Sequence, residues 1–67
     1  MNKMQQYVLS NVVFGRGAYS GLTGGAAYSA ATNACKELIA AGKMTKDFVA
    51  TEMGRNVFFA GQSSTKQ

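Results

Sequence analysis

The sequence contains few of the residues that catalysis and metal binding depend on. It has no histidine, one cysteine and three acidic residues, Glu37, Asp47 and Glu52. Histidine and grouped cysteines are the usual zinc ligands, and a cysteine nucleophile normally works beside a histidine base. Glu37 and Glu52 lie on different predicted helices, and Asp47 is explained by its position in a first helical turn, so no pair is evident for acid–base chemistry. We therefore expect no catalytic residue, no metal site and no cofactor, and we predict that the protein is not an enzyme.

An internal disulfide bond is also excluded, because Cys35 is the only cysteine. We expect its thiol in the core, since free cysteine is among the most buried residue types; a reactive thiol or an attachment point is the alternative. A chain of 67 residues rarely gains more than about 3–5 kcal/mol from its core, and small domains usually add a disulfide, a metal or a partner. We therefore predict that a partner stabilises this protein.

Acidic residues are outnumbered by basic ones, which gives a net charge of +4 at pH 7. The basic residues are spread singly and form no block of the kind that marks a nucleic-acid-binding arm. This diffuse charge favours an acidic partner, whether a protein, RNA or a membrane surface. Our main hypothesis is a structural or linker subunit that binds other, acidic protein subunits. The alternative is a small nucleic-acid-associated protein, such as a ribosomal or phage component.

Long hydrophobic runs are absent as well. No cleavable signal peptide is recognisable near Met1, and we expect an intracellular protein. Residues 17–35 carry no charge, and their small side chains recur every four positions, a spacing that membrane helices use for close packing. The same segment is rich in glycine, serine and threonine, which makes it too polar for a transmembrane helix. The sequence therefore argues against membrane insertion.

The first 25 residues fall into two contrasting segments. Residues 1–14 have apolar side chains four positions apart, which favours a short amphipathic helix. Their β-branched and aromatic side chains also suit a strand, and the sequence leaves both alternatives open. Residues 15–25 contain five glycines, which predicts a loop, because each glycine costs roughly 1 kcal/mol in a helix. The spacing of these glycines does not match the dinucleotide-binding motif.

Residues 26–41 have the clearest helical pattern. Alanine, the best helix former, dominates this segment, and residues spaced by three and four form one apolar face. Gly42 follows directly and suits the left-handed conformation that often ends a helix. The predicted face consists of Tyr28, Ala31, Cys35, Leu38 and Ile39.

Residues 43–60 predict a second helix. Thr45 is its expected N-cap, and Asp47 lies in the expected first turn, where the helix dipole favours negative charge. Gly61 is expected to end it. The predicted fold is therefore mainly α. It consists of an N-terminal helix or extended segment (1–14), a glycine-rich connector (15–25), a helical hairpin (26–60) and a polar tail (61–67).

The second predicted helix also carries our candidate partner-binding residues. Aromatic side chains and arginine dominate the binding energy of many protein interfaces, and apolar residues recur here at helical spacing. The candidates are Phe48, Val49, Met53, Arg55, Val57, Phe58 and Phe59.

Residues 36–59 contain a pattern that resembles one in a known protein family, although a helix, a glycine turn and a threonine-capped helix also form a common hairpin of short oligomerisation modules. A predicted helix ends at a glycine turn, Asp47-Phe48-Val49 follows, and Arg55-x-x-Phe58-Phe59 comes after it. This stretch resembles part of the phycobilisome rod linker domain, in which a capped helix opens with an acidic residue and Phe-Val. The spacer before Arg55 is shorter than in that family, and the family's lysine–serine element is absent. The resemblance implies a basic linker among acidic phycobiliproteins of a light-harvesting antenna, at the cytoplasmic or stromal face of thylakoid membranes.

Overall fold

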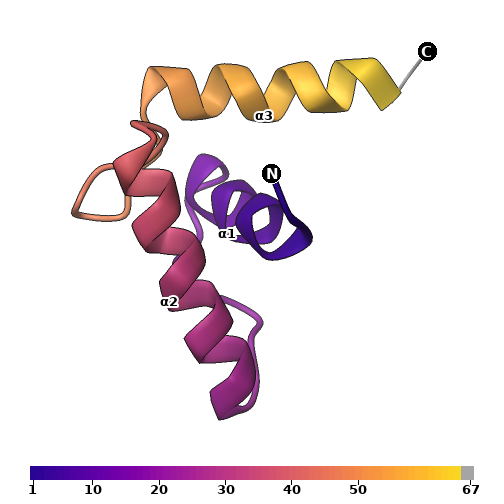
Figure 1. The fold of residues 1–67 in the computed structure, drawn as a ribbon. Helices are drawn as coiled ribbons and strands as arrows, with labels where there is room; N and C mark the ends of the chain where they lie inside the picture. Colours follow the sequence, from indigo (N-terminus) through magenta and orange to yellow (C-terminus); the bar gives the residue numbers. More distant parts are fainter. Residues whose placement is uncertain (66–67) are drawn as a thin grey trace.

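A computed structural model describes residues 1–65 of the chain, and the side chains of residues 1–61. This part forms three helices: α1 (Lys3–Val13), α2 (Gly25–Ala40) and α3 (Glu52–Thr65). Figure 1 shows α2 and α3 running in different directions, with α1 in the angle between them. Helix α1 packs against both, whereas α2 and α3 make little direct contact. The mainly α prediction is confirmed, and α1 joins the two later helices into one globule.

The N-terminal segment is a helix, and two reciprocal hydrogen bonds stabilise its first turn. The Asn2 side chain accepts a hydrogen bond from the Gln5 backbone N–H at 2.8 Å, and the Gln5 side chain accepts one from the Asn2 N–H at 3.0 Å. This capping box satisfies two donors that a helix start otherwise leaves unpaired. Of the two alternatives left open for this segment, the structure therefore selects the helix.

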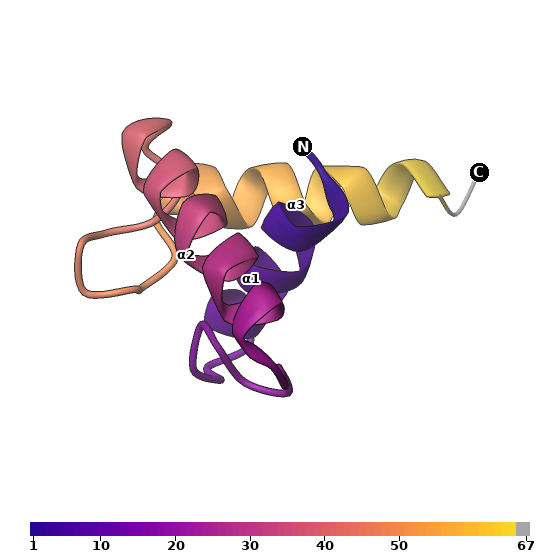
Figure 2. The same ribbon diagram turned by 60° about the horizontal axis from the view of Figure 1, so that its bottom comes forward.

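The glycine-rich connector leads from the end of α1 to the start of α2, as predicted (Figure 2). Hydrogen bonds from Asn11 of α1, which is almost fully buried, hold the connector against this helix. The Asn11 amide donates to the carbonyl oxygens of Ala18 and Ser20, both at 3.2 Å. The Tyr7 hydroxyl also donates to the Ser20 carbonyl, at 2.5 Å. Side chains of α1 thus fix a loop that has few side chains of its own to pack.

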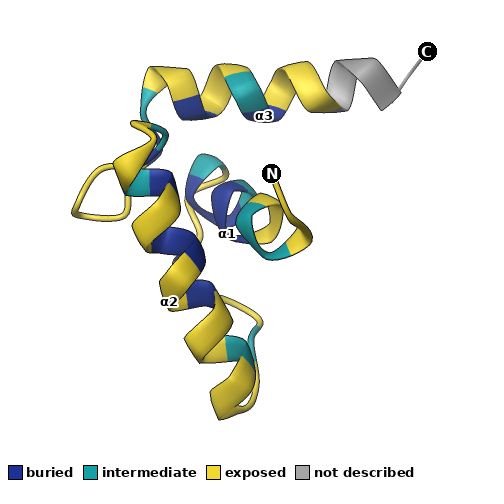
Figure 3. Ribbon diagram, in the orientation of Figure 1, coloured by how far each residue is buried: buried dark blue, intermediate teal, exposed yellow. Residues whose placement is uncertain are grey.

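The core surrounds α1, whose buried residues pack against one face of α2 and one face of α3 (Figure 3). Helix α2 contributes alanines and Cys35, whose small size lets α1 approach closely. Tyr28 is exposed, so the predicted apolar face of α2 is wrong at this position, and Ala34 is buried instead. The buried apolar residues are Val8, Leu9, Val12, Ala18, Ala31, Ala34, Cys35, Leu38, Met44, Ala50 and Phe58.

Residues 43–51 form a loop, so our prediction of a helix beginning near Thr45 is wrong. Met44 and Ala50 are buried and pair across the loop as an isolated antiparallel bridge. The Thr45 hydroxyl does accept a backbone hydrogen bond, from Val49 at 3.2 Å, but it closes the loop and caps no helix. The Thr45 N–H in turn donates to the Val49 carbonyl at 2.8 Å.

Helix α3 begins later because a second threonine provides the cap. The Thr51 hydroxyl accepts a hydrogen bond from the Gly54 N–H at 3.0 Å, as an N-cap does. Glu52, and not Asp47, then lies in the first turn. The helix also continues past Gly61 to Thr65, beyond its predicted end. Most of the predicted polar tail, the side chains of residues 62–67, lies outside the described residues.

Gly42 ends α2 as predicted, with a positive φ of 79°. Its N–H donates to the Ile39 carbonyl at 3.0 Å, and the Lys43 N–H donates to the Leu38 carbonyl at 2.9 Å. These two bonds form the Schellman motif, which satisfies carbonyls at the end of a helix.

We expect Gly42→Val to destabilise the protein by about 1–2 kcal/mol, because a β-branched side chain strongly disfavours this left-handed conformation. Gly42→Asn should cost less, since asparagine tolerates positive φ. Urea denaturation of both variants, followed by circular dichroism, checks the difference. Equal losses in the two variants would show that the conformation of residue 42 does not limit stability.

Candidate partner-binding surface

The seven candidate residues divide between the loop and α3. Phe48 and Val49 lie in the loop and are 40% and 55% exposed, and Met53 and Phe59 on α3 are 53% and 46% exposed. Arg55 is exposed and Val57 is half-buried. Phe58 differs from the others, because it is 9% exposed and belongs to the core. The structure therefore leaves Phe48, Val49, Met53, Arg55 and Phe59 accessible to a partner.

Phe48 is held in an unusual conformation at the end of an aromatic row. Its φ is 63°, a left-handed value that bulky side chains seldom adopt. Its ring meets the Tyr19 ring edge-on at 6.2 Å between centroids, and Tyr19 stacks on Tyr28 at 5.5 Å. The Tyr19 hydroxyl shares a hydrogen bond of 2.9 Å with Thr32. The loop, the connector and α2 thus each contribute one ring to the row of Phe48, Tyr19 and Tyr28.

A second group of rings joins the end of α1 to α3. Phe14, Phe58 and Phe59 contact one another edge-to-face, with centroids 5.3–6.2 Å apart. Phe58 is the buried member, whereas Phe14 is 55% exposed. Edge-to-face contacts are favourable, so Phe58 fixes the two outer rings at the surface. We call Phe14, Phe58 and Phe59 the phenylalanine cluster.

Arg16 lies directly beside this cluster, and sequence reasoning did not include it among the candidates. Its guanidinium carbon is 5.6 Å from the centre of the Phe14 ring, within the range of a cation–π interaction. Its Nε–H donates to the Asn11 carbonyl oxygen Oδ1 at 3.1 Å. No spacing in the sequence signals this arrangement, because the buried Asn11 and the contact with α3 create it.

The charges of the protein are not neutralised internally. Within residues 1–61, no lysine or arginine forms an ion pair with a carboxylate. Glu37 instead accepts a hydrogen bond from the Gln5 side chain, and one Arg55 terminal N–H donates to the Ala50 carbonyl at 3.1 Å. The excess positive charge therefore remains at the surface.

The described residues also bear on three other features: a metal site, a reactive thiol and a membrane-spanning helix. No group of three or more histidine, cysteine or acidic side chains there could hold a metal ion. Burial raises the pKa of the Cys35 thiol, although its hydrogen bond with Tyr19 opposes this shift. A protonated, buried thiol is a poor nucleophile, which fits the prediction that Cys35 is a core residue. Among the helices that the structure describes, none has the length and hydrophobicity to span a membrane.

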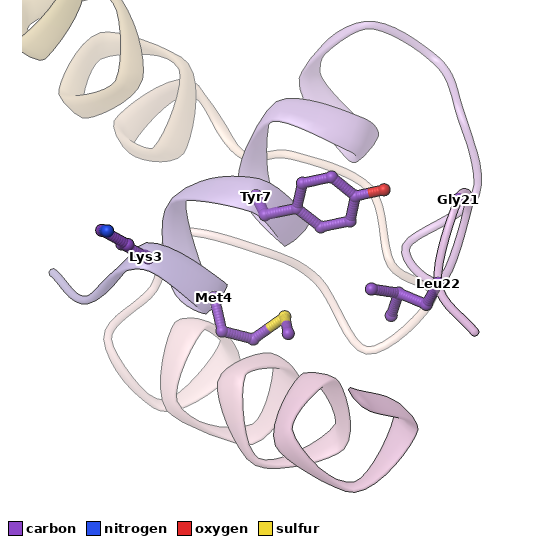
Figure 4. A pocket seen from close by; sticks show the side chains of 5 residues that line it. All are labelled: Lys3, Met4, Tyr7, Gly21 and Leu22. Atoms are coloured by element: carbon purple, nitrogen blue, oxygen red, sulfur yellow. The ribbon is translucent and has the colours of Figure 1, made fainter. Parts of the chain in front are cut away.

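A pocket of about 420 Å³ lies between the start of α1 and the connector (Figure 4). Lys3, Met4, Tyr7, Gly21 and Leu22 line it, and in Figure 4 the Lys3 side chain extends away from the side chains of Met4, Tyr7 and Leu22. The Tyr7 hydroxyl is already bonded to the Ser20 carbonyl. The pocket thus lacks the converging polar groups that a catalytic site requires.

The structure also bears on the resemblance to linker domains. Asp47-Phe48-Val49, which the resemblance places at a helix start, lies in the loop, whereas Arg55-x-x-Phe58-Phe59 does lie on a helix, α3. Comparison with known proteins adds no relative, since no family model, curated protein or solved structure significantly matches this chain.

Proposed function

We propose that this protein is a non-enzymatic structural subunit that binds an acidic protein partner through exposed apolar side chains of α3, the preceding loop and the end of α1. One observation supports this most strongly: the rings of Phe14 and Phe59 lie side by side at the surface, each about half exposed. Contiguous exposed apolar surface is characteristic of interaction sites. Aromatic side chains also dominate the binding energy of protein interfaces.

The charge distribution supports an acidic partner. The lysines and arginines of residues 1–61 have no carboxylate partners within the protein, and the net charge is +4. Complementary charge steers two proteins together and suppresses association between like-charged copies. Apolar contacts would then supply most of the binding free energy, and the surrounding cations would select the partner.

The resemblance to rod linker domains suggests a more specific form of the proposal. In that form, the assembly is a phycobilisome-type antenna, and the partners are acidic phycobiliproteins. The position of Arg55-x-x-Phe58-Phe59 on α3 and the basic charge support it. Co-purification followed by mass spectrometry identifies the partner and so tests this form directly.

We expect Phe59→Ala to weaken association with that partner by about 2 kcal/mol or more, as truncation of an interface hot spot does. Lys46→Gln is the matched control, because this exposed lysine has no internal partner, and an isolated surface charge is worth about 0–1 kcal/mol. Titration of both variants at two salt concentrations measures the two effects.

Nucleic-acid binding, the alternative function, predicts the opposite order of effects for Phe59→Ala and Lys46→Gln. If the protein binds nucleic acid, Lys46→Gln and similar changes would dominate, and affinity would fall steeply with salt because counterions are released. Phe58→Ala does not distinguish the two functions, since this ring lies in the core and its loss would unfold the protein.

A further inference from the structure

The protein itself holds the guanidinium of Arg16 in place. One edge is fixed by the hydrogen bond from Nε to Asn11 Oδ1 at 3.1 Å, and Asn11 is in turn buried and bonded to the connector. The guanidinium carbon lies 5.6 Å from the centre of the Phe14 ring. A side chain fixed in this way loses little conformational freedom when it binds a ligand, and preorganisation of this kind favours affinity.

The other edge of this guanidinium is free. Its two terminal nitrogens have no partner among the described residues, and Arg16 is exposed. Guanidinium groups bind carboxylates through two parallel hydrogen bonds, a geometry that matches both groups. An exposed arginine with one edge anchored and the other unused is therefore equipped to bind an anion.

A pair of exposed phenyl rings adjoins Arg16. Phe14 lies against the guanidinium, and Phe59 contacts Phe14 edge-on with centroids 6.2 Å apart. Both rings are about half exposed. A ligand that reaches the free edge of Arg16 would therefore place its neighbouring groups on two phenyl rings.

We propose that Arg16, Phe14 and Phe59 form a binding site for a carboxylate side chain adjacent to a large apolar side chain in the partner protein. This inference rests on the proposed function and names the element of the partner that the surface recognises. The carboxylate pairs with the terminal nitrogens of Arg16, and the apolar side chain packs on Phe14 and Phe59.

A protein carboxylate fits this site better than the phosphates of a nucleic acid. Strand binding requires several cations along the backbone path. Here a single oriented guanidinium is combined with two exposed phenyl rings. Apolar contact next to one charge is the chemistry of an acidic protein segment.

The test uses two dipeptide probes, N-acetyl-leucyl-aspartyl amide and its asparagine counterpart, titrated into the wild-type protein. NMR follows the Nε–Hε signal of Arg16 and the ring signals of Phe14 and Phe59. We expect the aspartyl probe to shift all three sets of signals and to bind about ten-fold more tightly than the asparaginyl probe, as a charge-assisted pair would. Equal binding of the two probes, or larger shifts with a short oligothymidylate, would overturn the proposal.

Variants give a second, independent measurement. Arg16→Lys keeps the charge but loses the planar fork, so we expect about ten-fold weaker binding of the aspartyl probe. Lys46→Gln should leave it unchanged, and circular dichroism establishes that both variants are folded. If Arg16→Lys binds as tightly as the wild type, the inference fails. In that case a loss of partner binding in Phe59→Ala would still support the proposed function, so the two failures are distinguishable.

Discussion

Replacing Gly54 with alanine is expected to abolish the cooperative unfolding transition of the isolated protein. Gly54 is buried in the first turn of α3, where the helix passes over the loop. A Cβ atom there would overlap the carbonyl group of Lys43, with the carbonyl carbon 2.9 Å away, and would lie 3.3 Å from Leu9 Cδ1. The backbone of Lys43 cannot yield as a flexible side chain would, so α3 must move away from the core.

The expected loss is large relative to the stability available. Overpacking of a closely packed site costs about 1–3 kcal/mol and occasionally more, while a domain of this size rarely has more than about 3–5 kcal/mol. Thermal unfolding followed by circular dichroism measures the result. Gly61→Ala is the matched control on the same helix, because its added Cβ would meet nothing within 4 Å apart from its chain neighbours and the backbone of its own helix. Alanine there should stabilise α3 by up to about 1 kcal/mol. A Gly54→Ala variant as stable as this control would show that α3 does not pack as described.

Asn11→Leu is expected to cost about 2–3 kcal/mol, although leucine has a similar branched shape and is more hydrophobic. Asn11 is 2% exposed, and its side chain bonds to the carbonyls of Ala18 and Ser20 and to Arg16. Leucine cannot donate a hydrogen bond to the Ala18 carbonyl, and Ala18 is itself buried. An unsatisfied buried group costs about 1–3 kcal/mol. The connector would also lose its attachment to α1.

The same substitution at an exposed site provides the comparison. Asn33 lies on the solvent side of α2, and Asn33→Leu should change stability by no more than about 0.5 kcal/mol. Urea denaturation of both variants measures the two free energies of unfolding. If Asn11→Leu were as stable as Asn33→Leu, the buried hydrogen bonds would not hold the connector in place.

Local signals in the sequence were sufficient to predict much of the fold. The alanine-rich segment predicts α2, and the glycine after it predicts the Schellman ending that Gly42 forms. The concentration of glycines predicts the connector. At the N-terminus, hydrophobic spacing alone did not separate helix from strand. The decisive signal was the capping box of Asn2 and Gln5, which is readable in the sequence as Asn-x-x-Gln.

The boundary of α3 was mispredicted because two threonines precede it. Thr45 and Thr51 both suit an N-cap, and Asp47 made the earlier position look favourable. Tertiary packing decides between them, because Met44 and Ala50 are buried opposite each other in a loop. That pairing depends on contacts between distant segments, which periodicity does not report.

The candidate surface was predictable only in part for a related reason. Phe58 and Phe59 are adjacent in sequence and chemically identical, yet one is buried and the other is exposed. Which of the two faces the core depends on the rotation of α3 against α1. Arg16 and Phe14 are brought to Phe59 by the same packing, so the site described above has no continuous signature in the sequence.

The most direct test of a structural role is the size at which the native protein fractionates from extracts of cells that express it. We predict that it elutes with a large protein complex, and that neither nuclease treatment nor moderate salt releases it, because apolar contacts at Phe59 and its neighbours provide most of the binding free energy. Release of the protein as a monomer by nuclease or by moderate salt would contradict the account and would favour a nucleic-acid-binding protein.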